Sequence, residues 1–185
     1  MILIFDTETT GLFPNELNWG RDYDQFPHLV QMAWVITDDD GKELDQENHI
    51  IQPDGYTIPK ESEEIHGIST RQALKEGIHE KVVLKAFLLD ARKCDIIVAH
   101  NIYFDTSIIK ANLLRHNIDR ELFNDILYKD KRYCTMIHGQ KLLGGKRPKL
   151  SELHQELFNE PFKDAHSAMG DVRAVERCYF KMRGL

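Results

Sequence analysis

The chain is poor in the residues that would place it in several classes of protein. It has three cysteines in 185 residues, and Cys94, Cys134 and Cys178 lie far apart. This spacing argues against a disulfide framework and against a Cys-x-x-Cys zinc site, so we expect three buried free thiols. No apolar run approaches the ~20 residues that a membrane span needs, and residues 1–5 lack the basic flank and cleavage site of a signal peptide. These absences predict a cytoplasmic protein that is not associated with a membrane.

Acidic residues outnumber basic residues overall, but the basic residues are concentrated in one segment. The chain has 24 basic and 30 acidic residues, and its net charge of -6 argues against a general polyanion binder. Residues 129–149 nevertheless contain seven basic residues and one acid, so this segment carries +6 while the remainder carries -12. The segment is either a contact surface for a nucleic-acid backbone or a solvated charged turn.

The length and hydrophobic pattern predict one domain that spans residues 1–185. A chain of this size with 42% hydrophobic residues can bury a substantial core. Apolar, β-prone segments predict five strands, at residues 1–5, 28–37, 44–51, 96–99 and 132–136. Segments with helical spacing predict helices at residues 61–66, 69–75, 82–93, 105–113, 151–158 and 168–182. The first three strands should form the antiparallel start of a sheet.

Two carboxylates follow the first apolar strand directly. Asp6 and Glu8 stand at positions i and i+2, so they point to the same face of an extended chain. Two like charges in one small space are unfavourable unless a cation lies between them, and a divalent metal ion is the obvious candidate. The alternative is that both residues open a solvated turn before Gly11, and these residues alone leave both interpretations open.

Two further acids stand at the start of apolar helix faces. Asp105 has apolar residues at i+3, i+4 and i+8, and Asp171 begins a similar stripe. Asp105 is therefore either a helix cap or a ligand.

His166 would lie roughly 140° from Asp171 on a continuous helix, so it must belong to the segment before the helix if both serve one site. Otherwise His166 is a surface histidine.

Residues 13–26 show neither the helical nor the strand period of hydrophobic residues. They are therefore expected to form a long loop between the first two predicted strands. The loop contains four aromatic residues, Phe13, Trp19, Tyr23 and Phe26. These side chains either stack on nucleic-acid bases or pack onto the domain.

Three separate segments resemble the exonuclease motifs of the DEDDh family, which includes the proofreading epsilon subunit of DNA polymerase III and ribonuclease T. They are Asp-Thr-Glu-Thr-Thr-Gly-Leu at residues 6–12, His-Asn-Ile-Tyr-Phe-Asp at 100–105 and His-Ser-Ala-Met-Gly-Asp at 166–171. Ile-His-Gly-Ile at residues 65–68 is similar to a further signature of this family. The three motifs stand in the order found in this family, and the resemblance extends over nearly the whole chain.

The resemblance implies an α/β, ribonuclease H-like fold with a mixed five-stranded sheet flanked by helices. It also implies 3′-5′ removal of nucleoside 5′-monophosphates with two divalent cations, Mg²⁺ or Mn²⁺. Four acids would hold these metals: Asp6, Glu8, Asp105 and Asp171. His166 would act as the general base. The residues implied to contact the substrate are Gly11, Leu12, His66, Asn101 and Phe104.

The expected substrate is single-stranded DNA with a free 3′ end, and a polymerase or repair complex is the implied partner. One alternative is an exoribonuclease that trims RNA ends, and another is a nucleic-acid-binding module on an inactive nuclease fold.

The sequence departs from the family in its long 13–26 loop and at Cys134, where relatives often have an acid. The absence of a tail after the last predicted helix weakens the expectation of a tethered place in a polymerase assembly.

Overall fold

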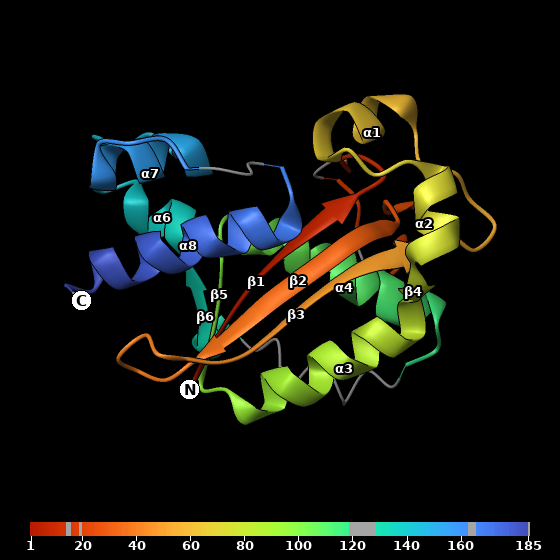
Figure 1. Ribbon diagram of the computed structural model, residues 1–185, viewed down its shortest axis with the longest axis horizontal. Coiled ribbons are helices and arrows are strands. Elements are labelled where there is room, and N and C mark those ends of the chain that lie inside the picture. Colours follow the sequence, from red (N-terminus) through yellow and green to blue (C-terminus); the bar gives the residue numbers. More distant parts are fainter. Residues whose placement is uncertain (14–15, 19, 119–128, 163–165, 185) are drawn as a thin grey trace.

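A mixed sheet forms the centre of the molecule, with helices on both faces (Figure 1). The computed structural model describes residues 1–13, 16–18, 20–118, 129–162 and 166–184. Within these ranges the sheet has six strands in the order β4-β3-β2-β1-β5-β6. The strands are β1 (Ile2–Thr9), β2 (Leu29–Thr37), β3 (Glu43–Gln52), β4 (Ile78–His79), β5 (Ile96–Ala99) and β6 (Arg132–Cys134).

The sheet is antiparallel on one side of β1 and parallel on the other. β1 pairs antiparallel with β2, and β2 pairs antiparallel with β3, as predicted for the first three strands. β5 pairs parallel with β1, and β6 pairs parallel with β5. The predicted ribonuclease H-like, mixed sheet is therefore confirmed. Its centre is β1, the strand that carries the first motif.

The predicted number of five strands was wrong because β4 was missed. β4 is two residues long and pairs in parallel with the end of β3, with Ile51 opposite Ile78. A strand of this length has no side-chain period that a sequence could reveal. The last strand also ends earlier than predicted, at Cys134, because Thr135 begins helix α6.

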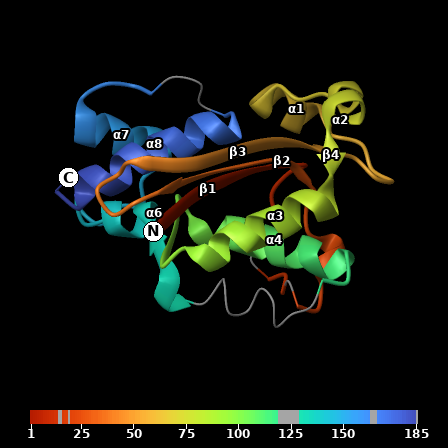
Figure 2. The ribbon, with the colours of Figure 1, turned by 60° about the horizontal axis from the view of Figure 1, so that its bottom comes forward.

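The helices form two layers and a cap at one end of the sheet (Figures 1 and 2). On one face lie α3 (Glu80–Lys93) and α4 (Ile102–Arg115). On the other lie α6 (Thr135–Gly139), α7 (Leu150–Phe158) and α8 (Ala168–Met182). Two short helices, α1 (Lys60–His66) and α2 (Thr70–Glu76), lie at the end where β1 finishes. The single-turn 3-10 helices are η1 (Tyr23–Gln25) and η2 (Lys129–Lys131).

β1 is buried on both faces of the sheet. The alternation of side chains along this strand decides which face each residue of the first motif points to. Leu3 and Phe5 pack into the core beneath α3 and α4, whereas Ile2 and Ile4 pack against α8. Because side chains alternate along a strand, Asp6 and Glu8 continue the α8 face. Thr7 continues the opposite face.

α3 buries one face, but some of its apolar residues lie outside that face. Val83 and Phe87 are buried, whereas Val82 and Leu89 are 58% and 62% exposed. The buried face continues through Leu84, Leu88 and Ala91.

The start of α2 is capped by Ser69. Its hydroxyl accepts a hydrogen bond from the Gln72 backbone N–H at 3.1 Å.

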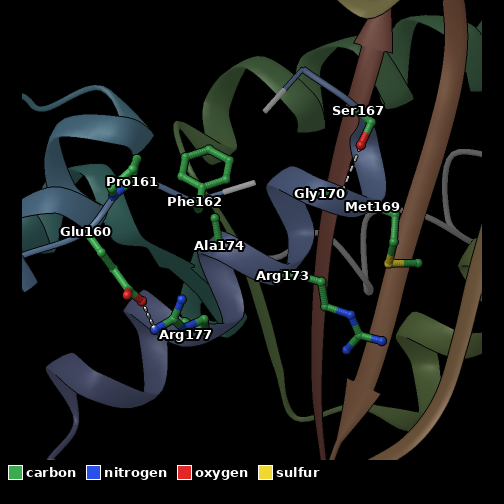
Figure 3. A pocket seen from close by; sticks show the side chains of 9 residues that line it. All are labelled: Glu160, Pro161, Phe162, Ser167, Met169, Gly170, Arg173, Ala174 and Arg177. Carbon is green, nitrogen blue, oxygen red and sulfur yellow. Dashed lines mark hydrogen bonds and ion pairs between the residues drawn. The ribbon is translucent and has the colours of Figure 1, made fainter. Parts of the chain in front are cut away.

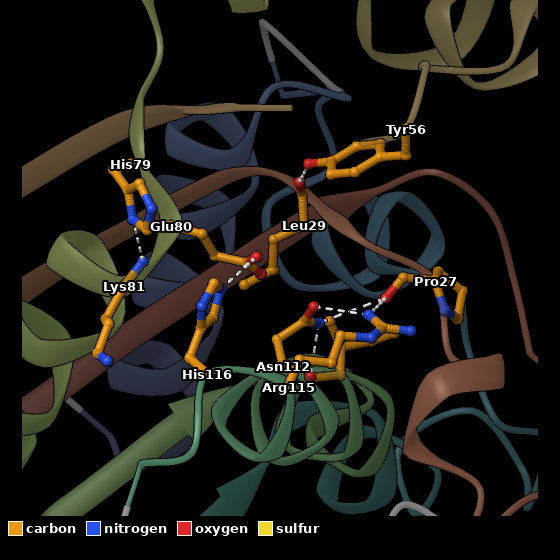
Figure 4. A network of polar contacts seen from close by, with 10 residues as sticks. Pro27, Leu29, Tyr56, His79, Glu80, Lys81, Asn112, Arg115 and His116 are labelled. Carbon is orange, nitrogen blue, oxygen red and sulfur yellow. Dashed lines mark hydrogen bonds and ion pairs between the residues drawn. The ribbon is translucent and has the colours of Figure 1, made fainter. Parts of the chain in front are cut away.

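A polar network joins α4 to the segment that leads into β2 (Figure 4). The Arg115 guanidinium donates to the carbonyls of Asp24, Phe26 and Pro27. His116, at the end of α4, contacts the buried Glu80 carboxylate at 2.9 Å. These contacts satisfy the exposed carbonyls of the segment and fix the entry to β2.

The three cysteines are buried free thiols, as predicted. Among the described residues, none of the helices combines the length and the apolarity that crossing a bilayer requires.

Candidate active site

Three of the four motif acids meet at the end of β1. Asp6 and Glu8 point from β1 toward α8, and Asp171 lies in the first turn of α8. Each of the three offers an oxygen, and these oxygens lie within 4.8 Å of one another. The solvated-turn interpretation of Asp6 and Glu8 is therefore wrong, because both are partly buried and face a third carboxylate.

Asp105 reaches the same region from the other face of the sheet. It lies in the first turn of α4, is only 3% exposed, and accepts a hydrogen bond from the Thr7 hydroxyl at 2.7 Å. It is not the helix cap, because the N-cap of α4 is Asn101 in the left-handed conformation. β5 pairs with β1 only as far as Ile4, so the first turn of α4 lies beside the unpaired end of β1.

The four carboxyl groups are electrostatically strained without a counter-ion. Burial raises the pKa of Glu8 to about 8, of Asp105 to about 7 and of Asp171 to about 6. Burial and repulsion from the other three acids also raise the pKa of Asp6 well above its usual range. An oxygen-only cluster with this unfavourable charge fits a hard divalent cation such as Mg²⁺ or Mn²⁺ rather than zinc.

His166 lies outside α8, as its spacing from Asp171 predicted. It is exposed and has a φ of 68°, a left-handed conformation, directly before the N-cap Ser167. Its backbone donates a hydrogen bond to the Asp171 carboxylate, and this contact together with the imidazole charge opposes the rise in the pKa of Asp171. The structure therefore brings His166 beside the acid cluster.

Gln31 anchors the start of α8 to the sheet. Its side-chain oxygen accepts a hydrogen bond from the Ala168 backbone N–H at 3.1 Å, and its amide donates to Asn48 at 2.9 Å. Gln31 stands opposite Glu8 in the β1–β2 register. The contact satisfies an N–H that the first turn of a helix leaves free, and it fixes where Asp171 enters the site.

A cavity of about 160 Å³ lies directly beside Glu8. Four of the five predicted substrate residues line it, namely Gly11, Leu12, His66 and Phe104. Leu12 is 87% exposed although it is apolar, so its side chain is available to a ligand. The cavity and the acid cluster share Glu8, so a group bound in the cavity would lie next to the carboxylates.

The fifth predicted substrate residue, Asn101, lines a second and larger cavity of about 470 Å³. Phe104 borders both cavities, so they adjoin each other. The wall of the second cavity includes Tyr103, which is 56% exposed, and Arg147 from the basic segment. The second cavity therefore combines aromatic side chains with a cation, and it shares Phe104 with the cavity beside Glu8.

The aromatic residues of the 13–26 loop mostly pack onto the domain. Phe26 is 3% exposed, and Phe13 packs against it with ring centroids 4.5 Å apart. Phe13 also stacks on Phe104 at 5.1 Å, and Tyr23 packs against the core. Trp19 lies outside the described residues. Base stacking is therefore excluded for Phe26.

The largest cavity described, about 510 Å³, lies on the outer face of α8 (Figure 3). Its arginines are paired, Arg177 with Glu160 at 2.8 Å and Arg173 with Glu176 at 2.9 Å. The motif acids are not among its lining residues. The acid cluster and its two adjoining cavities, rather than this space, form the candidate active site.

Sequence reasoning missed two residues of this site, Thr7 and Gln31. The alternation along β1 already placed Thr7 on the opposite face from Asp6 and Glu8, but nothing in the sequence indicated its partner.

His100 belongs to the second motif, yet its ring contacts Thr135 and the Pro148 carbonyl, both at 3.0 Å. Burial lowers the pKa of His100 to about 4, so it holds these segments together as a neutral side chain.

A mixed sheet with carboxylates gathered at the end of its central strand agrees with the ribonuclease H-like nuclease fold that the three motifs imply. A family model described as exonuclease matches residues 3–179. The chain therefore belongs to this exonuclease family, in agreement with its three DEDDh motifs.

Known relatives support this assignment. Ribonuclease T of Actinobacillus pleuropneumoniae serotype 5b (strain L20) is 26% identical over 194 residues, which cover 97% of this chain and 82% of the relative. A solved structure of exonuclease I superposes with a TM-score of 0.77 at 20% identity, over 99% of this chain and 40% of that one. Exonuclease I of E. coli in complex with a dT13 oligonucleotide gives a TM-score of 0.75 at 20% identity, over 98% and 40% of the two chains. The chain thus spans about 40% of the length of exonuclease I.

Proposed function

We propose that this single domain removes nucleoside 5′-monophosphates from the 3′ end of single-stranded DNA. Two divalent cations, Mg²⁺ or Mn²⁺, are held by Asp6, Glu8, Asp105 and Asp171. The observation that carries the proposal is the meeting of Asp6, Glu8 and Asp171 within 4.8 Å, beside a cavity lined by Leu12. Cations in such a cluster stabilise the attacking and leaving oxygens of a displacement at phosphorus.

Other parts of the chain bind the substrate and accept a proton. The cavity beside Glu8 binds the terminal nucleotide and directs its phosphodiester toward the acids. His166 accepts the proton of the attacking water, since an imidazole nitrogen can act as a general base and His166 contacts Asp171. The water oxygen forms a bond to phosphorus, and the bond between phosphorus and the 3′ oxygen of the preceding nucleotide breaks. That oxygen takes up a proton from solvent and becomes the new 3′ hydroxyl of the shortened strand. The released nucleotide keeps the phosphate as a 5′-monophosphate.

The two adjoining cavities favour a single strand over a duplex. Bases that are splayed apart can contact Leu12, Phe104 and Tyr103, and stacking on such side chains tolerates any base. Opening a duplex end instead costs ~1.4 kcal/mol for each base-pair step. A frayed or unpaired 3′ end is therefore the form that fits this surface.

DNA is favoured by one comparison and RNA by another. Similar solved structures hold exonuclease I with single-stranded oligonucleotides such as dT13, which supports a DNA substrate. The relative named ribonuclease T supports the second candidate, an exoribonuclease that trims RNA ends. A binding module without activity is disfavoured, because the four acids and His166 are all present.

Digestion of end-labelled DNA and RNA oligonucleotides will test the polarity and the substrate. With Mg²⁺ or Mn²⁺ we expect a 3′-labelled strand to release labelled mononucleotide at once, and a 5′-labelled strand to shorten stepwise. EDTA should stop both reactions, and a fully paired end should react slowly. Cutting of a circular single strand would contradict the proposal, and faster digestion of RNA than of DNA would favour the second candidate.

Arg147 should bind the substrate backbone without taking part in chemistry. It lines the second cavity, whereas its neighbour Lys146 is already paired with Glu152 at 2.8 Å. We expect Arg147→Gln to raise KM several-fold, with kcat little changed. The slope of log KM against log salt should fall by about 0.7, the value for one lost contact to a single strand.

The matched control is Lys141→Gln, which neutralises an exposed cation of the same segment. It should leave KM and its salt dependence close to those of the wild type. If Arg147→Gln behaves in the same way as this control, Arg147 is a solvated side chain that does not contact the substrate.

A further inference from the structure

Thr7 stands between two motif acids on β1, but its side chain points to the other face of the sheet. It follows Leu3 and Phe5 toward the core under α4, whereas Asp6 and Glu8 face α8. Thr7 is only 6% exposed. Its hydroxyl donates to Asp105 Oδ1 at 2.7 Å, across 98 positions of sequence and in a buried environment. It therefore joins the first motif directly to the second.

Asp105 is held by Thr7 and lies apart from the other three acids. Asp6, Glu8 and Asp171 share one side of the sheet, and Asp105 is not part of their group of close oxygens. It is 3% exposed, and a buried carboxylate is costly unless hydrogen bonds satisfy it. The Thr7 backbone N–H also donates to Asp105, so the same residue supplies two donors.

We propose that Thr7 is a positioning residue that holds the Asp105 carboxylate in the orientation needed to complete the metal site. The proposal rests on the proposed function, because it assumes that the four acids bind divalent cations. A carboxylate with one oxygen held by a buried hydroxyl cannot rotate freely about its Cβ–Cγ bond. The hydroxyl thus fixes in advance a ligand that would otherwise have to be ordered by the metal.

A comparison of Mg²⁺ binding with Ca²⁺ binding should reveal whether Thr7 orients the Asp105 carboxylate. Mg²⁺ demands near-ideal octahedral geometry, whereas Ca²⁺ accepts variable coordination by oxygen ligands. A misoriented Asp105 should therefore lower the affinity for Mg²⁺ more than the affinity for Ca²⁺. A general loss of folding would lower both affinities to the same extent.

The experiment is a calorimetric titration of the full chain with Mg²⁺ and with Ca²⁺, without nucleic acid. Thr7→Val keeps the branched shape but removes the donor, and Thr7→Ser keeps the donor but removes the methyl group. We expect Thr7→Val to weaken Mg²⁺ binding by about 10- to 100-fold, the usual effect of losing a group that orients a ligand. Thr7→Ser should bind Mg²⁺ nearly as the wild type does, and the loss in Thr7→Val should be smaller for Ca²⁺.

The matched control is Thr37→Val, another buried threonine on the neighbouring strand β2. Its hydroxyl has no hydrogen-bond partner among the described residues. This substitution should leave the affinity for both ions unchanged. If Thr7→Val does not fold, Thr7→Cys serves in its place, since a thiol is a weak donor of similar size and should give an intermediate loss.

Two results would overturn the inference alone. Equal Mg²⁺ affinity in Thr7→Val and the wild type would show that Asp105 needs no support from the hydroxyl. Equal losses in Thr7→Ser and Thr7→Val would show that the methyl group matters instead. If the wild type binds neither ion, or if Asp6→Asn binds both as well as the wild type does, the proposed function itself falls.

Discussion

Replacement of Asp6 by asparagine will abolish nuclease activity while the fold remains intact. Asp6 lies at the end of the central strand, and its carboxylate is grouped with those of Glu8 and Asp171. A metal ion contributes several kcal/mol to stabilising the charge of the transition state, so its loss should lower kcat by at least ~10³-fold. The measurement is the single-turnover rate on a 3′-labelled oligonucleotide with Mg²⁺. Full turnover by Asp6→Asn would contradict the metal assignment.

The same substitution should not destabilise the metal-free protein. Burial and three neighbouring acids raise the pKa of Asp6, and the pKa of Glu8 is raised to about 8. The folded state therefore binds more protons than the unfolded state between the usual carboxyl range and about pH 8. Wild-type stability must fall as pH rises through this window, and Asp6→Asn removes part of the repulsion that causes the fall.

Thermal unfolding in EDTA will measure this difference. The Tm of Asp6→Asn should equal or exceed that of the wild type, and the advantage should be larger at about pH 8 than at about pH 5. In a chain of this size each 1 kcal/mol changes Tm by about 2–4 °C. The exposed Asp54 supplies the control, since Asp54→Asn should show no such dependence on pH.

Replacement of His166 by alanine will lower kcat while substrate and metal binding persist. His166 lies before α8 and is exposed, so its imidazole can contact a water molecule at the acid cluster. General base catalysis is worth ~10²- to 10⁴-fold, and a bound cation already makes the water more acidic. We expect kcat to fall by that order and the acid limb of the pH–rate profile to change. Profiles of both proteins between about pH 5 and about pH 9, at saturating metal, will measure this.

The control for this experiment is His79→Asn, which removes an exposed imidazole far from the acids in sequence but keeps a side chain able to cap α3. It should leave kcat and the pH profile unchanged. An unaltered kcat and acid limb in His166→Ala would mean that His166 is not the base.

The sequence predicted the elements that carry the motif acids, because each acid lies in a strongly patterned local context. Asp6 and Glu8 follow an apolar strand at i and i+2, and Asp105 heads an inward helix face. Such features depend on the geometry of one element and need no knowledge of its neighbours. For the same reason the position of His166 outside α8 followed from its spacing to Asp171 alone.

The features that could not be predicted depend on how the elements pack together. α3 has apolar residues on more than one face, and only its contact with the sheet decides that Val83 is buried while Val82 is exposed. The end of β6 at Cys134 depends on Thr135, whose hydroxyl contacts the His100 ring at 3.0 Å. The contact between Thr7 and Asp105 joins two elements that are distant in sequence, so no local pattern contains it.

The acid cluster is built from the first strand and the last helix of the chain. Asp6 and Glu8 lie on β1, and Asp171 lies on α8, which packs against β1. During synthesis β1 leaves the ribosome long before α8 is complete, and domains generally fold as units. A growing chain therefore lacks the complete group of three carboxylates until α8 has been synthesised and has packed against β1.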